Sequence, residues 1–382
     1  MKIPAERDIA PDVLRGFALL GILLVNIPFM ALLSEEGLRG QYVEGIANNV
    51  ATVIIYGLFA GKFYILFSYL FGYSANYIVK GEKANRRRWI KRAFVLLFLG
   101  VIHFSLFWHG DILFLYGLFA LLLIPFIFRK DRTIKIWAII IYSVSTLILI
   151  TTAISSVIAE YLSDEDLKLS SGSSNFDSIM QNGNYLEAIG PRIELWTLGI
   201  VGGIFLQGGF VFAAFLAGLR AGRNKVLQRS THELKTSRAI KVGIFIGLPI
   251  ELTAAAVAVI NENSTQTSDA IYLACLITIF VVAPLLTRMY VAGILQVLER
   301  KPRYVSWIRP AGRMSLTLYI SQSILTTLVF GPWGLGLFQK VEAWMLIFIS
   351  LAIWLFLTQC AKLWLNKYRQ GPLEWFMHKL TA

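Results

Sequence analysis

Two ionisable residues, His103 and Asp111, lie in and just after an apolar stretch, where charge is costly. His103 is eleven residues beyond Arg92, which at the rise of a helix places it roughly 16 Å into a bilayer. An imidazole accepts a proton near neutral pH, and a carboxylate within reach orients it for general-base catalysis. The pair therefore predicts acid–base chemistry inside a membrane cavity. An interhelical hydrogen bond for His103 and a helix cap by Asp111 are the structural alternatives.

A polar stripe follows the first apolar segment. Asp12 and Arg15 are three residues apart, so they share a helix face and can pair. Asn26 comes eleven residues after Arg15, close to three full turns, and continues this face toward mid-membrane. The stripe fits interfacial anchoring with an interhelical hydrogen bond from Asn26, or one wall of a binding cavity.

Two further charges occur in successive apolar segments near the C-terminal half. Glu251 lies ten residues after Lys241, and Arg288 lies twelve residues before Arg300. Both counts start from basic loops on one side of the membrane, so the two side chains have matching depth. This predicts a buried ion pair between Glu251 and Arg288. The alternative is an anion site, because a guanidinium can clamp a phosphate.

Composition defines the class of protein. The 382 residues are 56% hydrophobic and only 15% charged, with a mean hydropathy of +0.63, whereas soluble domains contain about 25% charged residues. These values exclude a soluble, disordered or coiled-coil chain. Cys275 and Cys360 lie in apolar runs and are interpreted as core residues, without a disulfide or metal site.

Hydropathy predicts an all-α, polytopic transmembrane bundle of about ten spans, each near the 20 residues that cross a bilayer. Gly61 and Lys62 interrupt the second segment, which favours a broken helix within 49–79. Loops after the even-numbered segments are basic and the others are acidic or neutral, which predicts cytoplasmic N- and C-termini. The segments lie near residues 12–33, 50–79, 89–108, 110–128, 134–159, 194–219, 239–260, 269–297, 313–331 and 341–365.

The organisation is that of one transmembrane domain over residues 1–382, with an external loop at 160–193 that suits a lid or hairpin. The net charge of +13 resides in the short loops, as expected for the positive-inside rule and for contact with the lipid bilayer. No nucleic-acid motif accompanies it, so nucleic acid is not an expected partner. Gly199 and Gly203 have the spacing of tight helix packing. Both a single bundle and a homodimer are compatible with the sequence.

Five motifs, in order along the chain, resemble the bacterial YeiB-like membrane proteins, a family with a domain of unknown function in its C-terminal region, here about 220–382. The resemblance implies a multi-pass protein of the bacterial inner membrane. The motifs are Asp12-Val-Leu-Arg15-Gly16 with Asn26, Leu66-Phe67-Ser68-Tyr-Leu-Phe-Gly72, Gly110-Asp111-Ile112-Leu113-Phe-Leu-Tyr116, Gly312-Arg313 through Gln322-Ser323, and Gly371-Pro372-Leu373-Glu374-Trp375.

That family is in turn similar to transmembrane acyltransferases such as heparan-alpha-glucosaminide N-acetyltransferase. This resemblance implies transfer of an acyl group from cytoplasmic acetyl-CoA, or another acyl-CoA, to a small-molecule, glycan or lipid acceptor. No cofactor would be bound permanently. His103 would be the general base and Asp111 its partner, and Arg15 with Arg86, Arg87 and Arg88 would attract the CoA phosphates. The positive-inside rule is the alternative explanation of the arginine run.

The sequence thus supports two main hypotheses. In the acyltransferase, substrate-binding residues are predicted at Asp12, Arg15, Asn26, His109, Tyr116, Arg288 and Gln322. In the rival transporter or lipid-handling protein, the polar residues of the first, seventh and eighth segments line a path and His103 relays protons. A third reading is an assembly factor in which the buried polar groups only fix helix packing.

Overall fold

The computed structural model describes residues 9–162, 175–228 and 233–381, and these residues form helices and connecting loops. The chain is an all-α polytopic protein, as predicted. The helices are α1 Ala10–Asn26, α2 Pro28–Ala31, α3 Ile46–Ile54, α4 Lys62–Val79, α5 Arg86–Leu106, α6 Leu113–Leu123, α7 Asp131–Leu162, α8 Asn175–Asn182, α9 Ile189–Gly203, α10 Gly209–Arg223, α11 Glu233–Val242, α12 Leu248–Glu262, α13 Asp269–Arg300, α14 Arg309–Arg313, α15 Ser315–Phe330, α16 Ala343–Lys367 and α17 Pro372–Thr381.

Seven helical stretches of the described residues are long and apolar enough to cross a membrane. They are Ile46–Val79, Lys83–Leu106, Asp131–Leu162, Ile189–Arg223, Thr236–Glu262, Asp269–Arg300 and Ala343–Lys367. Shorter apolar helices occupy Leu113–Phe126 and Ser315–Phe330, and α1 covers the first predicted segment. Every predicted segment therefore contains a helix, although three of these helices are shorter than a full span.

The second segment is broken where the sequence indicated. α3 passes into a π-helical turn at Ile55–Phe59, and α4 begins only at Lys62. Gly61 between them has φ of +79°, a backbone conformation that residues with a Cβ rarely adopt. The 49–79 segment thus consists of two helices, and the break brings Lys62 into the protein interior.

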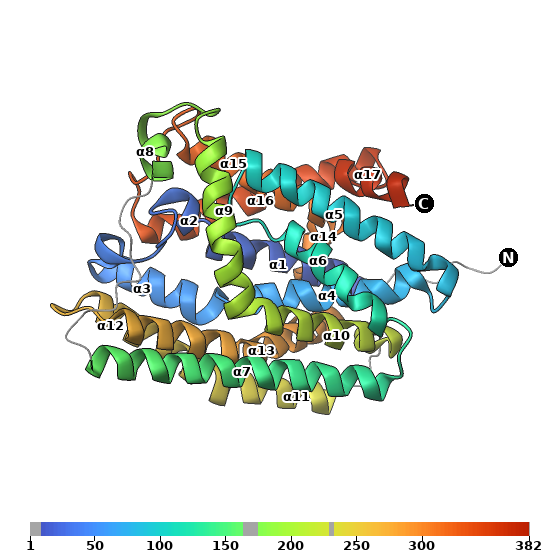
Figure 1. The fold of residues 1–382 in the computed structure, drawn as a ribbon. Coiled ribbons are helices and arrows are strands. Elements are labelled where there is room, and N and C mark those ends of the chain that lie inside the picture. The colour runs from blue at the N-terminus through green and yellow to red at the C-terminus, as the bar shows by residue number, and fades with distance from the viewer. Residues whose placement is uncertain (1–8, 163–174, 229–232, 382) are drawn as a thin grey trace.

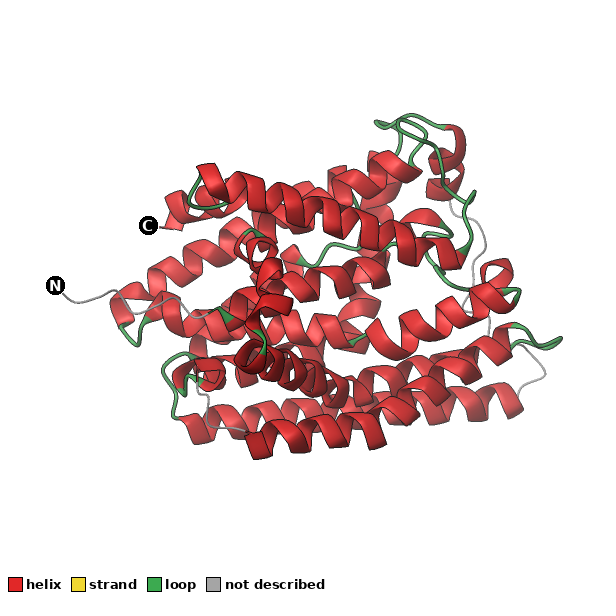
Figure 2. Cartoon of the chain, turned by 180° about the vertical axis from the view of Figure 1, so that it is seen from behind, coloured by secondary structure: helices red, strands yellow, loops and turns green. Residues whose placement is uncertain are grey.

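The long helices run nearly side by side, and Figure 1 shows α7, α12 and α13 along one side of the bundle. α4 and α10 pack closely, since a Cβ at Gly72 or Gly218 would meet backbone carbonyl oxygens of the partner helix. α9 differs from these helices because it crosses the bundle steeply (Figure 1) before a π-helical turn, Ile204–Gly208, joins it to α10. Figure 2 shows the helices from behind, again mostly side by side.

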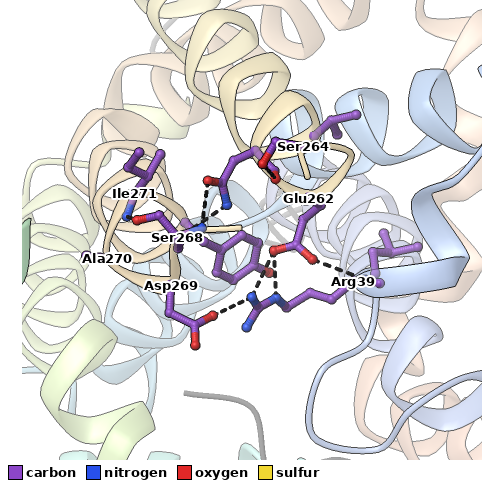
Figure 3. Close-up of polar contacts among 12 residues, drawn as sticks. Arg39, Glu262, Ser264, Ser268, Asp269, Ala270 and Ile271 are labelled. Carbon is purple, nitrogen blue, oxygen red and sulfur yellow. Dashed lines mark hydrogen bonds and ion pairs between the residues drawn. The ribbon is translucent and has the colours of Figure 1, made fainter. Parts of the chain in front are cut away.

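One end of the bundle carries the loops after α4, α6, α10, α13 and α16, which are rich in Lys and Arg; we call it the basic end. At the opposite end, the guanidinium of Arg39 donates to Glu262 at 2.9 Å and to Asp269 at 2.5 Å (Figure 3). The same guanidinium lies 4.2 Å from the ring centre of Tyr272. Arg39 therefore ties the loop before α3 to the turn between α12 and α13.

Within the predicted external loop, 160–193, residues 163–174 lie outside the described residues. The described part of this loop lies at the end opposite the basic end. In this part, α8 is held against the loop after α2, because Ser34 donates to the carboxylate of Asp177 through both its backbone N–H and its hydroxyl. This contact places α8 beside Ser34, which lines the cavity described below.

Candidate functional site

His103 and Asp111 are brought together at the centre of the bundle. His103 Nδ1 lies 2.8 Å from Asp111 Oδ1, and neither side chain has exposed surface. The same carboxylate caps α6 by accepting from the backbone N–H groups of Leu113 at 3.1 Å and Phe114 at 2.7 Å. Asp111 thus serves as a helix cap and as a histidine partner at once, and its orientation is fixed by the backbone.

The second nitrogen of His103 faces Ser323, a residue for which the sequence suggested no role. Nε2 lies 2.8 Å from Ser323 Oγ, and α15 also places Tyr319 beside the imidazole with ring centres 5.1 Å apart. In the neutral tautomer in which Nδ1–H donates to the Asp111 carboxylate, Nε2 is the acceptor for the serine hydroxyl. The three side chains form an Asp–His–Ser relay. The signal was Ser323's place in the Gly312–Ser323 motif.

One cavity, of about 470 Å³, opens from the site toward the end opposite the basic end. Its polar wall includes Asn26, Tyr64, His109 and Asp111, and its apolar wall comes mainly from α9 and α6. We call it the outer cavity. His109 Nε2 donates to the carbonyl of Ser34 at 3.2 Å, whereas its buried Nδ1 has no hydrogen-bond partner among the described residues. A hydrogen-bond donor on a bound ligand would satisfy His109 Nδ1.

The glycines of α9 border this cavity. Gly199 and Gly203 line it together with Gln207, and a Cβ added at either glycine would meet no atom of the described residues within 4 Å. The prediction that their spacing serves tight helix packing is therefore wrong for packing within this chain. Because α9 crosses the bundle steeply, these glycines face the outer cavity and not a neighbouring helix.

A second cavity, of about 240 Å³, lies toward the basic end; we call it the inner cavity. Arg15, Arg92 and Arg313 line it, with Glu374 as a single acidic residue. Glu374 is occupied in capping α15, since it accepts from the backbone N–H groups of Leu316 and Thr317. The three guanidinium groups therefore give the inner cavity the positive charge expected of an anion site.

The two cavities meet at a thin partition. Ile112 and Tyr116 line both of them. The Tyr116 hydroxyl is fixed 2.7 Å from Ser68 Oγ, and its ring packs edge-on against Phe71 and Phe215. Asp111 faces the outer cavity and Tyr319 the inner one. The relay therefore stands beside the partition, with one cavity on each side.

The stripe on α1 contributes to both cavities. Arg15 lines the inner cavity and pairs with Asp12 at 3.5 Å, as the i,i+3 spacing predicted. Asn26 lines the outer cavity, where its carbonyl oxygen accepts from the Tyr64 hydroxyl. One face of α1 thus places the guanidinium of Arg15 in the inner cavity and the amide of Asn26 in the outer cavity.

The predicted ion pair between Glu251 and Arg288 is not formed. Glu251 Oε2 instead binds Lys62 Nζ at 2.6 Å, with both side chains fully buried, while Arg288 lies exposed on α13. Sequence counting matched the depths of the two predicted partners but not the faces of their helices. The break at Gly61 supplies the true partner.

Other predicted site residues lie away from both cavities. Gln322 donates to the carbonyl of Leu19 at 3.1 Å and so joins α15 to α1. The three arginines at 86–88 are exposed at the start of α5, where they project from the basic end. Arg92 and Arg313, for which the sequence suggested no ligand, line the inner cavity in their place. Among the described residues, no three His, Cys, Asp or Glu side chains converge as metal ligands.

Comparison with known proteins gives matches along the whole chain. Residues 221–382 match the family described as "Protein of unknown function (DUF418)". The chain is 28% identical to the uncharacterized protein YeiB of Escherichia coli, over 98% of this chain and 96% of the relative. It is 26% identical to the uncharacterized protein YxaH of Bacillus subtilis, over 98% and 94%. No solved structure matches the chain. These matches confirm the resemblance found in the motifs: residues 221–382 match the DUF418 family, and the chain is similar along its length to YeiB and YxaH.

Proposed function

We propose that the protein is a transmembrane acyltransferase that moves an acyl group from a thioester donor to a hydroxyl or amine acceptor. The observation that carries this proposal is the buried His103–Asp111 pair, 2.8 Å apart, beside a partition with one cavity on each side. A carboxylate-oriented imidazole is suited to general-base work. Enclosure by the bundle keeps water from hydrolysing the thioester.

The donor side is the inner cavity. Its cationic residues, Arg15, Arg92 and Arg313, suit the phosphate groups of an acyl-CoA, because guanidinium groups bind phosphate through paired hydrogen bonds. The positive-inside rule places the basic end in the cytoplasm of a bacterial cell with this protein in its inner membrane. Acyl-CoA is then on the correct side to enter this cavity.

The acceptor side is the outer cavity. Asn26 and the unpartnered Nδ1 of His109 present a side-chain amide and a hydrogen-bond acceptor. These groups suit an acceptor with hydroxyl or amine groups, such as a glycan, a lipid headgroup or a small polar molecule. The acceptor would enter from the end that carries α8.

The test is transfer of labelled acetyl groups. Purified protein would be incubated with acetyl-CoA labelled in its acetyl group and with a bacterial membrane extract. We expect labelled product from the wild type and at least a hundredfold less from His103→Ala, since general-base groups contribute about 10²–10⁴-fold. His378→Ala is the matched control, because this exposed histidine of α17 lies outside both cavities.

A transporter is the competing function, and the same preparation distinguishes it. If the wild type produced no labelled product but, in vesicles, moved a solute along an ion or proton gradient, transport would replace acyl transfer. The polar residues proposed for a transport path, Asp12, Arg15, Glu251 and Arg288, do not share a cavity, since only Arg15 lines one of the two described above. Acyl transfer is therefore the function that we favour.

A further inference from the structure

His103 can act directly on only one group, and that group belongs to the protein. Its side chain has no exposed surface, and it is absent from the linings of both cavities. Nδ1 is engaged by Asp111 and Nε2 by Ser323, each at 2.8 Å. A base acts on the proton within hydrogen-bond reach of it. In this structure the only hydroxyl within that reach of Nε2, among the described residues, is Ser323 Oγ.

The hydrogen-bond directions favour activation of the serine. The Asp111 carboxylate also accepts two backbone N–H bonds from α6, so it is held as an acceptor for Nδ1–H. The lone pair on Nε2 is then directed at the hydroxyl of Ser323. This is the arrangement by which a carboxylate and an imidazole turn a weak serine hydroxyl into a nucleophile. Ser321, by comparison, donates its hydroxyl to the carbonyl of Thr317 in its own helix.

The partition supplies a reason for a covalent step. Direct transfer requires that donor and acceptor meet with their reacting atoms about 3–3.5 Å apart. Ile112 and Tyr116 separate the two cavities, so ligands entering from opposite ends meet this barrier. Ser323 lies one turn after Tyr319, a residue of the inner cavity wall, and it bonds through His103 to Asp111 in the outer cavity wall. Ser323 is itself buried and lines neither cavity, so it stands between the two walls, one helical turn from the inner one.

We propose that Ser323 is the nucleophile and carries the acyl group as an ester between two half-reactions. This inference rests on the proposed acyl-transfer function. In the first half-reaction, Ser323 Oγ attacks the thioester carbonyl while its proton passes to His103 Nε2. The carbon–sulfur bond then breaks, and the leaving thiolate takes that proton to become free thiol. In the second, an acceptor hydroxyl or amine attacks the ester, its proton passes to Nε2, and Ser323 Oγ leaves and regains the proton from His103.

This two-step route has a signature that needs no acceptor. The first half-reaction is reversible. In the absence of acceptor, the wild type therefore transfers label from free CoA, labelled in its CoA part, into acetyl-CoA. Ser323→Ala removes the nucleophile, and we expect it to reduce both exchange and transfer at least a hundredfold. Ser321→Ala is the matched control on the same helix and should retain both activities within about twofold.

The decisive experiment combines this exchange assay with peptide mass spectrometry of the full-length protein after incubation with acetyl-CoA and denaturation. The expected result is an acetyl group on the Ser323 peptide of the wild type, absent from Ser323→Ala. If the wild type transfers label to an acceptor but shows neither exchange nor acetylated Ser323, the covalent step is overturned while acyl transfer stands. If the wild type performs no transfer at all with any acceptor, the proposed function fails together with this inference.

A folding defect in Ser323→Ala does not weaken the test. Exchange and acetylation are measured on the wild type itself. The variant's thermal midpoint in detergent, compared with that of Ser321→Ala, shows whether lost activity reflects lost structure. Retention of transfer by a stably folded Ser323→Ala above about a tenth of the wild-type rate would also overturn the proposal.

Discussion

Lys62 Nζ lies 2.6 Å from Glu251 Oε2, and neither side chain has any exposed surface. Lys62 also donates to the carbonyl of Tyr56 at 3.0 Å, so the pair ties the break between α3 and α4 to α12. Two charges removed from water stabilise a structure only while each satisfies the other. The stability of the break between α3 and α4 therefore depends on keeping both members of this pair.

Removing the charge of Glu251 should leave Lys62 buried without its partner. We expect Glu251→Gln to destabilise the protein by about 3–5 kcal/mol, measured as a lower thermal midpoint in detergent. Adding Lys62→Met should restore part of the loss, because it removes the unpaired charge. Adding Arg288→Gln should restore nothing. Rescue by the Arg288 change instead would support the pairing that the structure does not contain.

Acidification should act through His109. Burial is the main reason that the pKa of His109 is lowered to about 4, with the Ser34 carbonyl opposing this shift and Arg192 adding to it. The unfolded chain binds a proton on this residue below about pH 6.5 and the folded chain does not. Stability is therefore complete above about 6.5 and falls as the pH drops toward 4, by up to about 1.4 kcal/mol per unit.

The check is a series of thermal midpoints from pH 7 to pH 4.5 for the wild type and His109→Gln. The glutamine amide can still donate to Ser34 but does not titrate, so its midpoint should fall less steeply with acid. Parallel curves for the two proteins would show that another group controls the acid response.

The open side of α9 offers a way to block the outer cavity without disturbing packing. Gly203→Leu places a large side chain into the cavity, and no described atom lies within 4 Å of its Cβ. We expect acyl transfer to fall at least tenfold, with the thermal midpoint unchanged or raised because glycine is a weak helix former. Gly202→Leu is the control, since Gly202 has equal space but lies outside the cavity lining. Equal loss in both variants would contradict this location for the acceptor.

Charge in the inner cavity should control binding of the donor. Arg92→Gln removes one of its three guanidinium groups, and we expect the KM for acetyl-CoA to rise about tenfold, equivalent to about 1.4 kcal/mol. Arg87→Gln, at an exposed position of α5, should change the KM less than twofold. Steady-state kinetics with acetyl-CoA as the varied substrate measures both. A larger rise in KM for Arg87→Gln than for Arg92→Gln would place the donor site at the arginines 86–88 and not in the inner cavity.

Much of the fold could be predicted because the bilayer imposes simple lengths and a charge rule. Apolar runs near 20 residues located the helices, and Gly61 located the break. The proximity of His103 and Asp111 also followed from the sequence, since a short turn separates their helices. Local spacing and hydropathy determine such features directly.

The features that the sequence did not reveal depend on which helix faces meet. Ser323 is 220 residues from His103, and Lys62 is 189 residues from Glu251, so no local pattern connects either pair. The glycines of α9 suggested contact between helices, yet the steep crossing of α9 makes them the border of a cavity. Depth in the membrane can be counted along a sequence, whereas the direction that a residue faces depends on the assembled bundle.

The barrier formed by Ile112 and Tyr116 has an electrical consequence. A membrane that stores energy as voltage cannot contain a continuous watery channel, because ions would flow through it and dissipate the stored energy. Ile112 and Tyr116 place an aliphatic and an aromatic side chain between the two cavities, where a continuous channel would conduct ions. An acyl group transferred from one side of this partition to the other would cross without a pathway for sodium ions or protons.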